Sequence, residues 1–249
     1  MLDAHCHLDR FENPLAVMRT CDERGAFVVA VTNLPSHFVA GRSHVLPFKR
    51  VRLALGLHPL TARQHAAELP LFERLLKETS FVGEVGLDFS RHGRGTEVLQ
   101  LQTFRIVAGL LSSFPKLATI HSRGAERPVL DVLREYSTPP SVFHWYTGSI
   151  PVLEDILRSG HYFSVNPSMA ASANGRKIIN AIPPNRILTE SDGPYGTVRG
   201  APARPWDVPV IEAHLARVWN KNTTEVRAAV WDNFKRLMAP LRSPADIRS

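Results

Sequence analysis

Residues 1–9, Met-Leu-Asp-Ala-His-Cys-His-Leu-Asp, form a short apolar run that contains two histidines, His5 and His7. Side chains alternate between the two faces of an extended strand, so His5 and His7 would point the same way and Cys6 the other way. Two imidazoles on one strand face form part of a metal site and need further ligands from elsewhere. Such a pair also occurs by chance in edge strands and expression tags, so the rest of the chain must decide.

Apolar, β-rich runs alternate with helix-like segments along the chain, a pattern typical of a parallel α/β sheet. Strands are predicted at residues 2–7, 27–32, 51–57, 81–87, 117–121, 141–144, 162–165 and 187–190. Helices are predicted at residues 14–25, 70–78, 96–113, 125–136, 151–159, 176–182, 207–219 and 224–238. The pattern predicts a TIM-type (β/α)₈ barrel, which usually needs about 250 residues. A doubly wound sheet is the alternative, but residues 8–11 lack its Gly-rich first turn.

The predicted barrel is a single domain over residues 1–239, followed by a flexible tail at 240–249. A formal net charge of +7 and a pI near 9.8 favour an anionic partner such as nucleic acid. Two cysteines are too few for a disulfide framework and suit the reducing cytoplasm. No signal peptide and no apolar run of about 18 residues is present, so a cytoplasmic protein without a membrane span is expected.

Candidate metal ligands recur at or near the carboxyl ends of the predicted strands. They are His5, His7, Glu84, His121, His144 and Asp192. In a barrel these strand ends share one rim, where catalytic residues gather, so the six side chains are expected to meet in one pocket. Four imidazoles and two carboxylates can hold two divalent cations, with Glu84 bridging them.

Each ligand candidate also has an ordinary structural explanation. His121 could donate to a backbone carbonyl, His144 could pack beside Trp145 and Tyr146, and Asp192 could cap the next helix. Glu84 is harder to explain in this way, because a charge in an apolar strand is costly unless it is paired or binds a metal. The joint occurrence of six such residues at strand ends favours the metal site.

Further candidates surround the predicted pocket. His58, after the third strand, would contact a substrate phosphate or a water, and the guanidinium of Arg123 would grip a phosphate. Arg204, in the long loop after the eighth strand, would contribute to a basic rim around the site. Trp145 and Tyr146 would stack on bases, with burial against the next helix as the alternative for both.

Seven motifs together resemble the TatD-type metal-dependent deoxyribonucleases, a branch of the amidohydrolase-like barrels. The motifs are Asp3-Ala-His-Cys-His-Leu-Asp9, Gly56-Leu-His-Pro59, Gly83-Glu-Val-Gly-Leu-Asp88, Ile120-His-Ser-Arg123, His144-Trp-Tyr-Thr-Gly148, Leu188-Thr-Glu-Ser-Asp-Gly-Pro-Tyr195 and Asn233-Phe234. The resemblance implies a divalent site built from the six ligands, with Mg²⁺, Mn²⁺ or Zn²⁺ as the ion. It also implies phosphodiester hydrolysis, commonly from the 3′ end of DNA, with RNA as a further substrate.

The expected mechanism is a two-metal hydrolysis in which Asp192 is the general base and Glu84 is the central catalytic ligand. Glu190 would order the groups behind the ligands, and Arg123 would steady the phosphate. The chain also resembles the TatD-like nuclease subunit of bacterial Qat anti-phage defence systems, which implies protein partners. Two other classes stay open: an amidohydrolase or lactonase with the same histidines, and a nucleic-acid-binding subunit whose activity is gated by partners.

Overall fold

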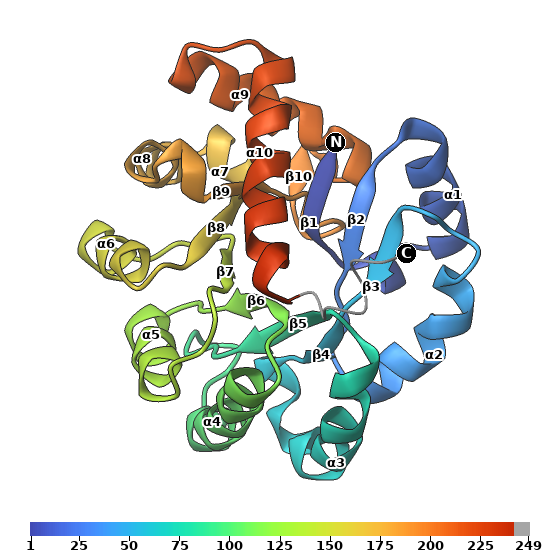
Figure 1. Ribbon diagram of the computed structural model, residues 1–249, viewed down its shortest axis with the longest axis vertical. Coiled ribbons are helices and arrows are strands. Elements are labelled where there is room, and N and C mark those ends of the chain that lie inside the picture. Colours follow the sequence, from blue (N-terminus) through green and yellow to red (C-terminus); the bar gives the residue numbers. More distant parts are fainter. Residues whose placement is uncertain (242–249) are drawn as a thin grey trace.

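Parallel strands form the centre of the computed structural model, which describes residues 1–241 (Figure 1). Neighbouring strands pair in chain order, as β1-β2-β3 and as β4-β5-β6-β7-β8-β9. Their bounds are Leu2–Cys6, Phe27–Ala30, Val51–Leu53, Leu55–Leu57, Phe81–Gly86, Leu117–His121, Val142–His144, Tyr162–Val165 and Ile187–Thr189. The two sheets close into a (β/α)₈ barrel, which confirms the predicted fold class.

Backbone hydrogen bonds join the last strand to the first. The Asp192 amide donates to the His5 carbonyl at 3.0 Å, and the His7 amide donates to the Gly193 carbonyl at 2.8 Å. Closure therefore brings Asp192, which follows the last strand of the barrel, beside His5 and His7 at the end of the first strand. The third predicted strand is divided into β3 and β4 at Ala54, whose carbonyl accepts from the Thr32 hydroxyl at 2.9 Å.

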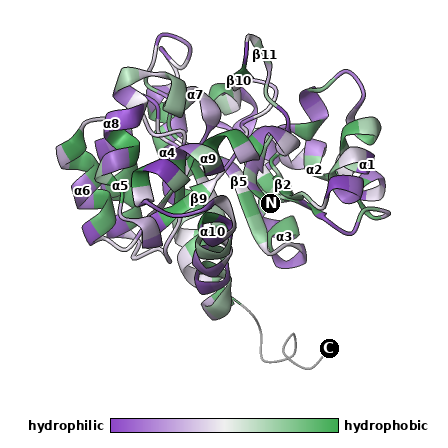
Figure 2. Ribbon diagram, turned by 90° about the horizontal axis from the view of Figure 1, so that it is seen from above, coloured by the Kyte–Doolittle hydropathy of each residue, from purple (hydrophilic) through white to green (hydrophobic). Residues whose placement is uncertain are grey.

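Helices surround the strands on the outside of the barrel (Figure 1). In order from α1 to α10 they are Pro14–Arg24, Pro35–Val45, His65–Leu75, Glu97–Ser113, Glu126–Glu135, Ile150–Arg158, Pro167–Ala171, Ala173–Ala181, Val208–Trp219 and Thr223–Met238. Helix α10 covers the amino end of the barrel, where the side-chain amide of Asn233 donates to the Ile187 carbonyl at 2.7 Å. Seen from above, α10 and the hairpin of β10 (Thr197–Val198) and β11 (Ala201–Pro202) lie at opposite ends of the molecule (Figure 2). Among the described residues, no helix is long and apolar enough to cross a membrane.

Several local predictions were wrong. Helix α2 was missed because its apolar residues show little helical periodicity, and only Pro35 and Phe38 of this helix are buried. Helix α3 begins at His65, five residues before the predicted start, so Pro70 lies inside the helix. The loop after β9 contains a short hairpin, β10 (Thr197–Val198) and β11 (Ala201–Pro202). Of the predicted tail, residues 242–249 lie outside the described part of the chain.

The barrel interior is apolar over most of its length and polar at its carboxyl end. Asp3, His5, His7, Glu84 and Glu190 are all at most 3% exposed. Burial of charged groups is costly unless they are paired or bind an ion, so this polar cluster requires mutual contacts or a ligand. The cluster identifies the functional end of the barrel.

His161, just before β8, is a buried histidine far from this cluster. Its Nδ1 atom accepts a hydrogen bond from the Ser141 amide at 3.1 Å. Burial, followed by the charges of Arg134 and Arg186, lowers the pKa of His161 to about 4. The folded state therefore holds a neutral imidazole over a pH range in which the unfolded chain binds a proton.

Acidification should accordingly destabilise the fold through His161. Because the pKa is lowered on folding, this stabilisation is present above the unfolded value of 6.5 and is lost as the pH falls towards 4. The loss amounts to about 3 kcal/mol of unfolding free energy at most. Urea unfolding of wild type and His161→Asn between pH 8 and pH 4.5 measures it, since Asn keeps an acceptor but does not titrate. Equal pH slopes for the two proteins would contradict the assignment.

Candidate metal centre

Glu84 lies at the centre of the polar cluster, on β5, and its side chain is 2% exposed. Its Oε1 atom lies 2.5 Å from Nδ1 of His121 and 2.7 Å from Nε2 of His144. Its Oε2 atom lies 3.1 Å from Nε2 of His7 and 3.6 Å from Nε2 of His5. One carboxylate thus faces four of the predicted ligands, as a bridging group between two cations would.

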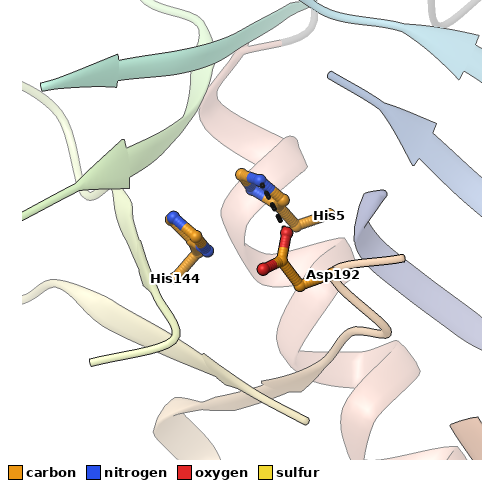
Figure 3. A group of neighbouring side chains, drawn as sticks. All are labelled: His5, His144 and Asp192. Carbon is orange, nitrogen blue, oxygen red and sulfur yellow. Dashed lines mark ion pairs between the residues drawn. The ribbon is translucent and has the colours of Figure 1, made fainter. Parts of the chain in front are cut away.

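Asp192 completes the set of six predicted ligands. Its Oδ1 atom lies 3.7 Å from Nε2 of both His5 and His7. The His144 ring stacks on the His5 ring with centroids 3.9 Å apart, so β1, β7 and the segment after β9 converge here (Figure 3). The structure brings together all six residues that the sequence indicated.

The donor set fits divalent cations. Three overlapping groups have ligand atoms within 4.8 Å of one another: His5–His144–Asp192, His5–His7–Glu84 and His58–Glu84–His121. Oδ1 of Asp192 is buried and has no hydrogen-bond partner among residues 1–241, although two imidazoles lie close to it. A cation between these groups would satisfy this carboxylate oxygen, and imidazole with carboxylate is the ligand chemistry of Zn²⁺ and Mn²⁺ sites.

Opposing effects determine the charge of Glu84 and Asp192. Burial raises the pKa of Glu84, but His58, His144 and His121 outweigh it and hold this pKa well below its usual range. Burial, and then the charge of Glu84, raise the pKa of Asp192 well above its usual range. The cluster therefore holds one ionised carboxylate at its centre and one carboxylate of high proton affinity beside it.

Asp88 is a site residue that the sequence analysis did not identify as functional. Its Oδ2 atom lies 2.9 Å from Nε2 of His121, while Nδ1 of the same ring faces Glu84. Burial lowers the pKa of His121, but the charge of Glu84 and the hydrogen bond with Asp88 raise it to about 9. Asp88 therefore orients the ring from behind, as carboxylates do for metal-ligating histidines. Its position directly after a strand that carries a candidate ligand was the available signal.

Glu190 ties together the strands behind the ligands. Its carboxylate accepts hydrogen bonds from the side-chain amide of Asn166 at 3.0 Å, from the backbone amide of Trp145 at 3.1 Å and from the Ser164 hydroxyl. Its Oε1 atom lies 3.9 Å from Nδ1 of His144. Burial, and then the charge of Asp192, raise the pKa of Glu190 well above its usual range. This placement is compatible with the supporting role predicted for Glu190.

His58 belongs to the same cluster, with its Nε2 atom 3.3 Å from Oε2 of Glu84. Its Nδ1 atom accepts a hydrogen bond from the Leu60 amide at 3.1 Å. Burial lowers the pKa of His58, so the neutral ring must carry its single proton on Nε2. His58 thus presents a donor towards the site, which suits contact with a carboxylate or phosphate oxygen better than metal ligation.

A cavity of about 640 Å³ opens above the cluster. His58 and Arg123 line it, together with Trp145. Arg204 is not among the lining residues, and its guanidinium lies over the Trp206 ring, 5.5 Å from the ring centroid. Tyr146 is 1% exposed and donates to the Ser149 carbonyl, so the suggestion that it stacks on bases was wrong.

Asp3 and Ser191 hold Asp192 in place. The Asp3 carboxylate accepts from the Ser191 amide at 2.9 Å and from the Ser191 hydroxyl at 2.5 Å. Asp192 itself has a φ of 46°, in the left-handed region that few residues other than glycine, Asn and Asp adopt. A buried carboxylate therefore stabilises the unusual backbone conformation that aims Asp192 at the histidines.

Removal of the Ser191 hydroxyl should weaken metal binding. In Ser191→Ala the buried Asp3 loses a donor, and the turn that orients Asp192 is less well held. The affinity for Mn²⁺ should fall by about 10- to 100-fold, as for other groups that orient metal ligands. Isothermal titration calorimetry on the apo-protein measures this, with Ser191→Thr as a control that keeps the hydroxyl. Unchanged Mn²⁺ affinity in a folded Ser191→Ala protein would refute this role.

Comparison with known proteins agrees with this geometry. Residues 2–239 match the family model described as TatD related DNase. The human protein named deoxyribonuclease TATDN3 is 25% identical over 266 residues, covering 97% of this chain and 96% of that protein. A Mycobacterium tuberculosis protein named as an uncharacterized metal-dependent hydrolase, TatD, is 29% identical, with 95% and 97% covered. The crystal structure of YjjV, a TatD homologue from Escherichia coli, shares the fold with a TM-score of 0.85 at 22% identity, covering 95% of this chain and 97% of that one.

Proposed function

The chain belongs to the TatD-related DNase family, and we propose that it is a divalent-metal-dependent deoxyribonuclease. The observation that carries the proposal is the convergence of Glu84, His5, His7, His121, His144 and Asp192 under one cavity. The basic composition, with a net charge of +7, supports a polyanionic substrate. A lysine bridge of the kind used by many related binuclear amidohydrolases is replaced by Glu84, which favours the nuclease over an amidohydrolase or lactonase.

Two cations are proposed, one near His5, His7 and Asp192 and the other near His121 and His144, with Glu84 between them. When bound, such ions neutralise charge on the scissile phosphate and lower the pKa of the attacking water. Mg²⁺, Mn²⁺ and Zn²⁺ are the candidate ions. Glu84 contributes the charge that holds both, and Asp88 fixes the orientation of His121.

Asp192 is the proposed general base. Its carboxylate would lie beside the attacking water as well as a cation, within reach of the proton that the water loses. It takes the proton of the attacking water, the water oxygen forms the new bond to phosphorus, and the bond to the leaving 3′ oxygen breaks. That oxygen then takes up a proton. The Nε2–H group of His58 and the guanidinium of Arg123 donate to phosphate oxygens as negative charge moves onto them.

The finer features of the activity also form part of the proposal. Cleavage proceeds from the 3′ end of single-stranded DNA, and RNA is the second substrate to test. Because both cysteines are free and buried, a reducing cytoplasm suits the chain. The motif resemblance extends to the nuclease subunit of an anti-phage defence complex, so partner proteins would gate or direct the activity in the cell.

End-labelled single-stranded DNA and RNA, incubated with Mg²⁺ or Mn²⁺, test the proposal directly. Wild type should shorten a 5′-labelled DNA strand stepwise, EDTA should stop the reaction, and Asp192→Asn should be inactive. Stepwise shortening of a 3′-labelled strand instead would show that cleavage starts at the 5′ end. Folded, metal-loaded protein that cleaves neither nucleic acid would refute the nuclease, and a panel of lactones and amides would then test the other hydrolases.

A further inference from the structure

Tyr195 is an exposed aromatic residue at the edge of the metal centre. Its residue surface is 55% exposed, and it lines the cavity above the cluster. Its ring meets the His7 ring with centroids 5.0 Å apart and planes at 82°. In an edge-to-face contact of this kind at least one face of the tyrosine ring stays uncovered by the partner ring.

The loop that carries Tyr195 is held on both sides. The Gly196 amide donates to the Asp192 carbonyl at 2.8 Å, and the Ala203 amide donates to the Gly196 carbonyl at 2.7 Å. A Cβ atom on Gly196 would lie 2.3 Å from the Ser191 carbonyl oxygen, so the loop backbone packs directly against the segment that carries the ligand. The backbone beside Tyr195 is therefore held in place, and a ring that is 55% exposed contributes little to core packing.

The wall of the cavity across from Tyr195 carries the guanidinium of Arg123 and the imidazole of His92. Tyr195 follows β9, the last strand of the barrel, while His92 and Arg123 follow β5 and β6 on the far side of the mouth. Arg123 makes no ion pair with any residue in the described part of the chain, 1–241. The metal centre lies between an aromatic wall and a wall that can donate to phosphates.

We propose that Tyr195 is the base-stacking residue of this site, which rests on the nuclease function proposed above. The ring binds the face of the nucleobase next to the scissile phosphate, while Arg123 and His92 hold the sugar-phosphate backbone across the cavity. Every base has a π-face, so this contact determines position along the strand rather than sequence. Inside a duplex the neighbouring base pairs cover both faces of each base, so the nucleotide that stacks on Tyr195 must be unstacked or lie at a strand end.

The test removes the Tyr195 ring and one base of the strand, separately and together, and compares the effects on the Kd. Single-stranded oligothymidylate, and versions with one abasic site moved along the strand, are bound to protein in an Asp192→Asn background with Mn²⁺. Fluorescence anisotropy gives the Kd. With Tyr195 present, one abasic position should weaken binding by about 5- to 150-fold, the usual contribution of a base–aromatic stack. Tyr195→Leu should abolish that difference, and Tyr195→Phe, which keeps the ring, should preserve it.

Equal abasic penalties with Tyr195 and with Tyr195→Leu, or no penalty at any position, would overturn the stacking assignment. Circular dichroism checks that each variant is folded, which the exposed position of Tyr195 favours. The cleavage assay on wild type separates this result from the proposed function. If wild type cleaves DNA but the abasic penalty does not depend on Tyr195, only the stacking proposal is refuted. If the penalty depends on Tyr195 but wild type does not cleave, the nuclease function is refuted and the protein only binds single strands.

Discussion

Replacing Glu84 with glutamine should lower kcat by about a thousandfold or more while the barrel remains folded. Glutamine keeps the shape of the side chain but removes the charge that lies within 3.6 Å of His5, His7, His121 and His144. Loss of the proposed bridging ligand would remove several kcal/mol of transition-state stabilisation, which corresponds to this factor. The variant should also bind less metal, because an amide oxygen cannot bridge two cations as a carboxylate does.

The measurement is kcat on single-stranded DNA at saturating Mn²⁺, together with the metal content of the purified protein. Glu212→Gln provides a matched control. Glu212 is equally buried, at 1% exposure, but it pairs with Arg227 between α9 and α10. Loss of that pair should reduce stability and leave kcat unchanged. Metal-dependent cleavage by Glu84→Gln at more than a tenth of the wild-type rate would exclude Glu84 as the bridging ligand.

Replacing Gly56 with alanine should lower the free energy of unfolding by about 3–5 kcal/mol, near the upper limit for a single added methyl group. A Cβ atom at this position of β4 would lie 1.5 Å from the carbonyl oxygen of Thr32. Backbone cannot move aside as the end of a side chain can, so β4 and the segment after β2 that carries Thr32 would have to separate. The same carbonyl accepts from the Glu84 amide at 3.0 Å, so the disturbance reaches the metal centre.

Urea denaturation of wild type and Gly56→Ala measures this loss of unfolding free energy. Gly41→Ala is the matched control, because it adds the same methyl group inside α2, where the nearest contact is the Leu53 side chain at 3.2 Å. Alanine is also favoured over glycine in helices by up to about 1 kcal/mol, so this variant should stay within about 1 kcal/mol of wild type. A Gly56→Ala protein as stable as Gly41→Ala would show that the strands accommodate the methyl group.

The sequence was sufficient to predict the barrel and the convergence of the six ligand candidates for a physical reason. His5 lies on β1 and His7 directly after it, and parallel strands in a barrel bring their carboxyl ends to one rim. Glu84, His121, His144 and Asp192 could therefore be predicted to meet without knowledge of any contact. Strand period and topology act over the whole chain, and the structure agrees with the sequence at these strand-end residues.

Other features depend on local packing that no periodicity encodes. Arg204 has a long, flexible side chain, and only the fold shows that its guanidinium lies over the Trp206 ring and not in the cavity lining. Asp88 becomes part of the site only because His121 points one ring nitrogen at it and the other at Glu84. Tyr195 borders the cavity because the backbone of Gly196, the next residue, packs against Ser191. The strand pattern thus specified which ligands meet, whereas the tertiary contacts alone determined how they are oriented and which side chains line the substrate cavity.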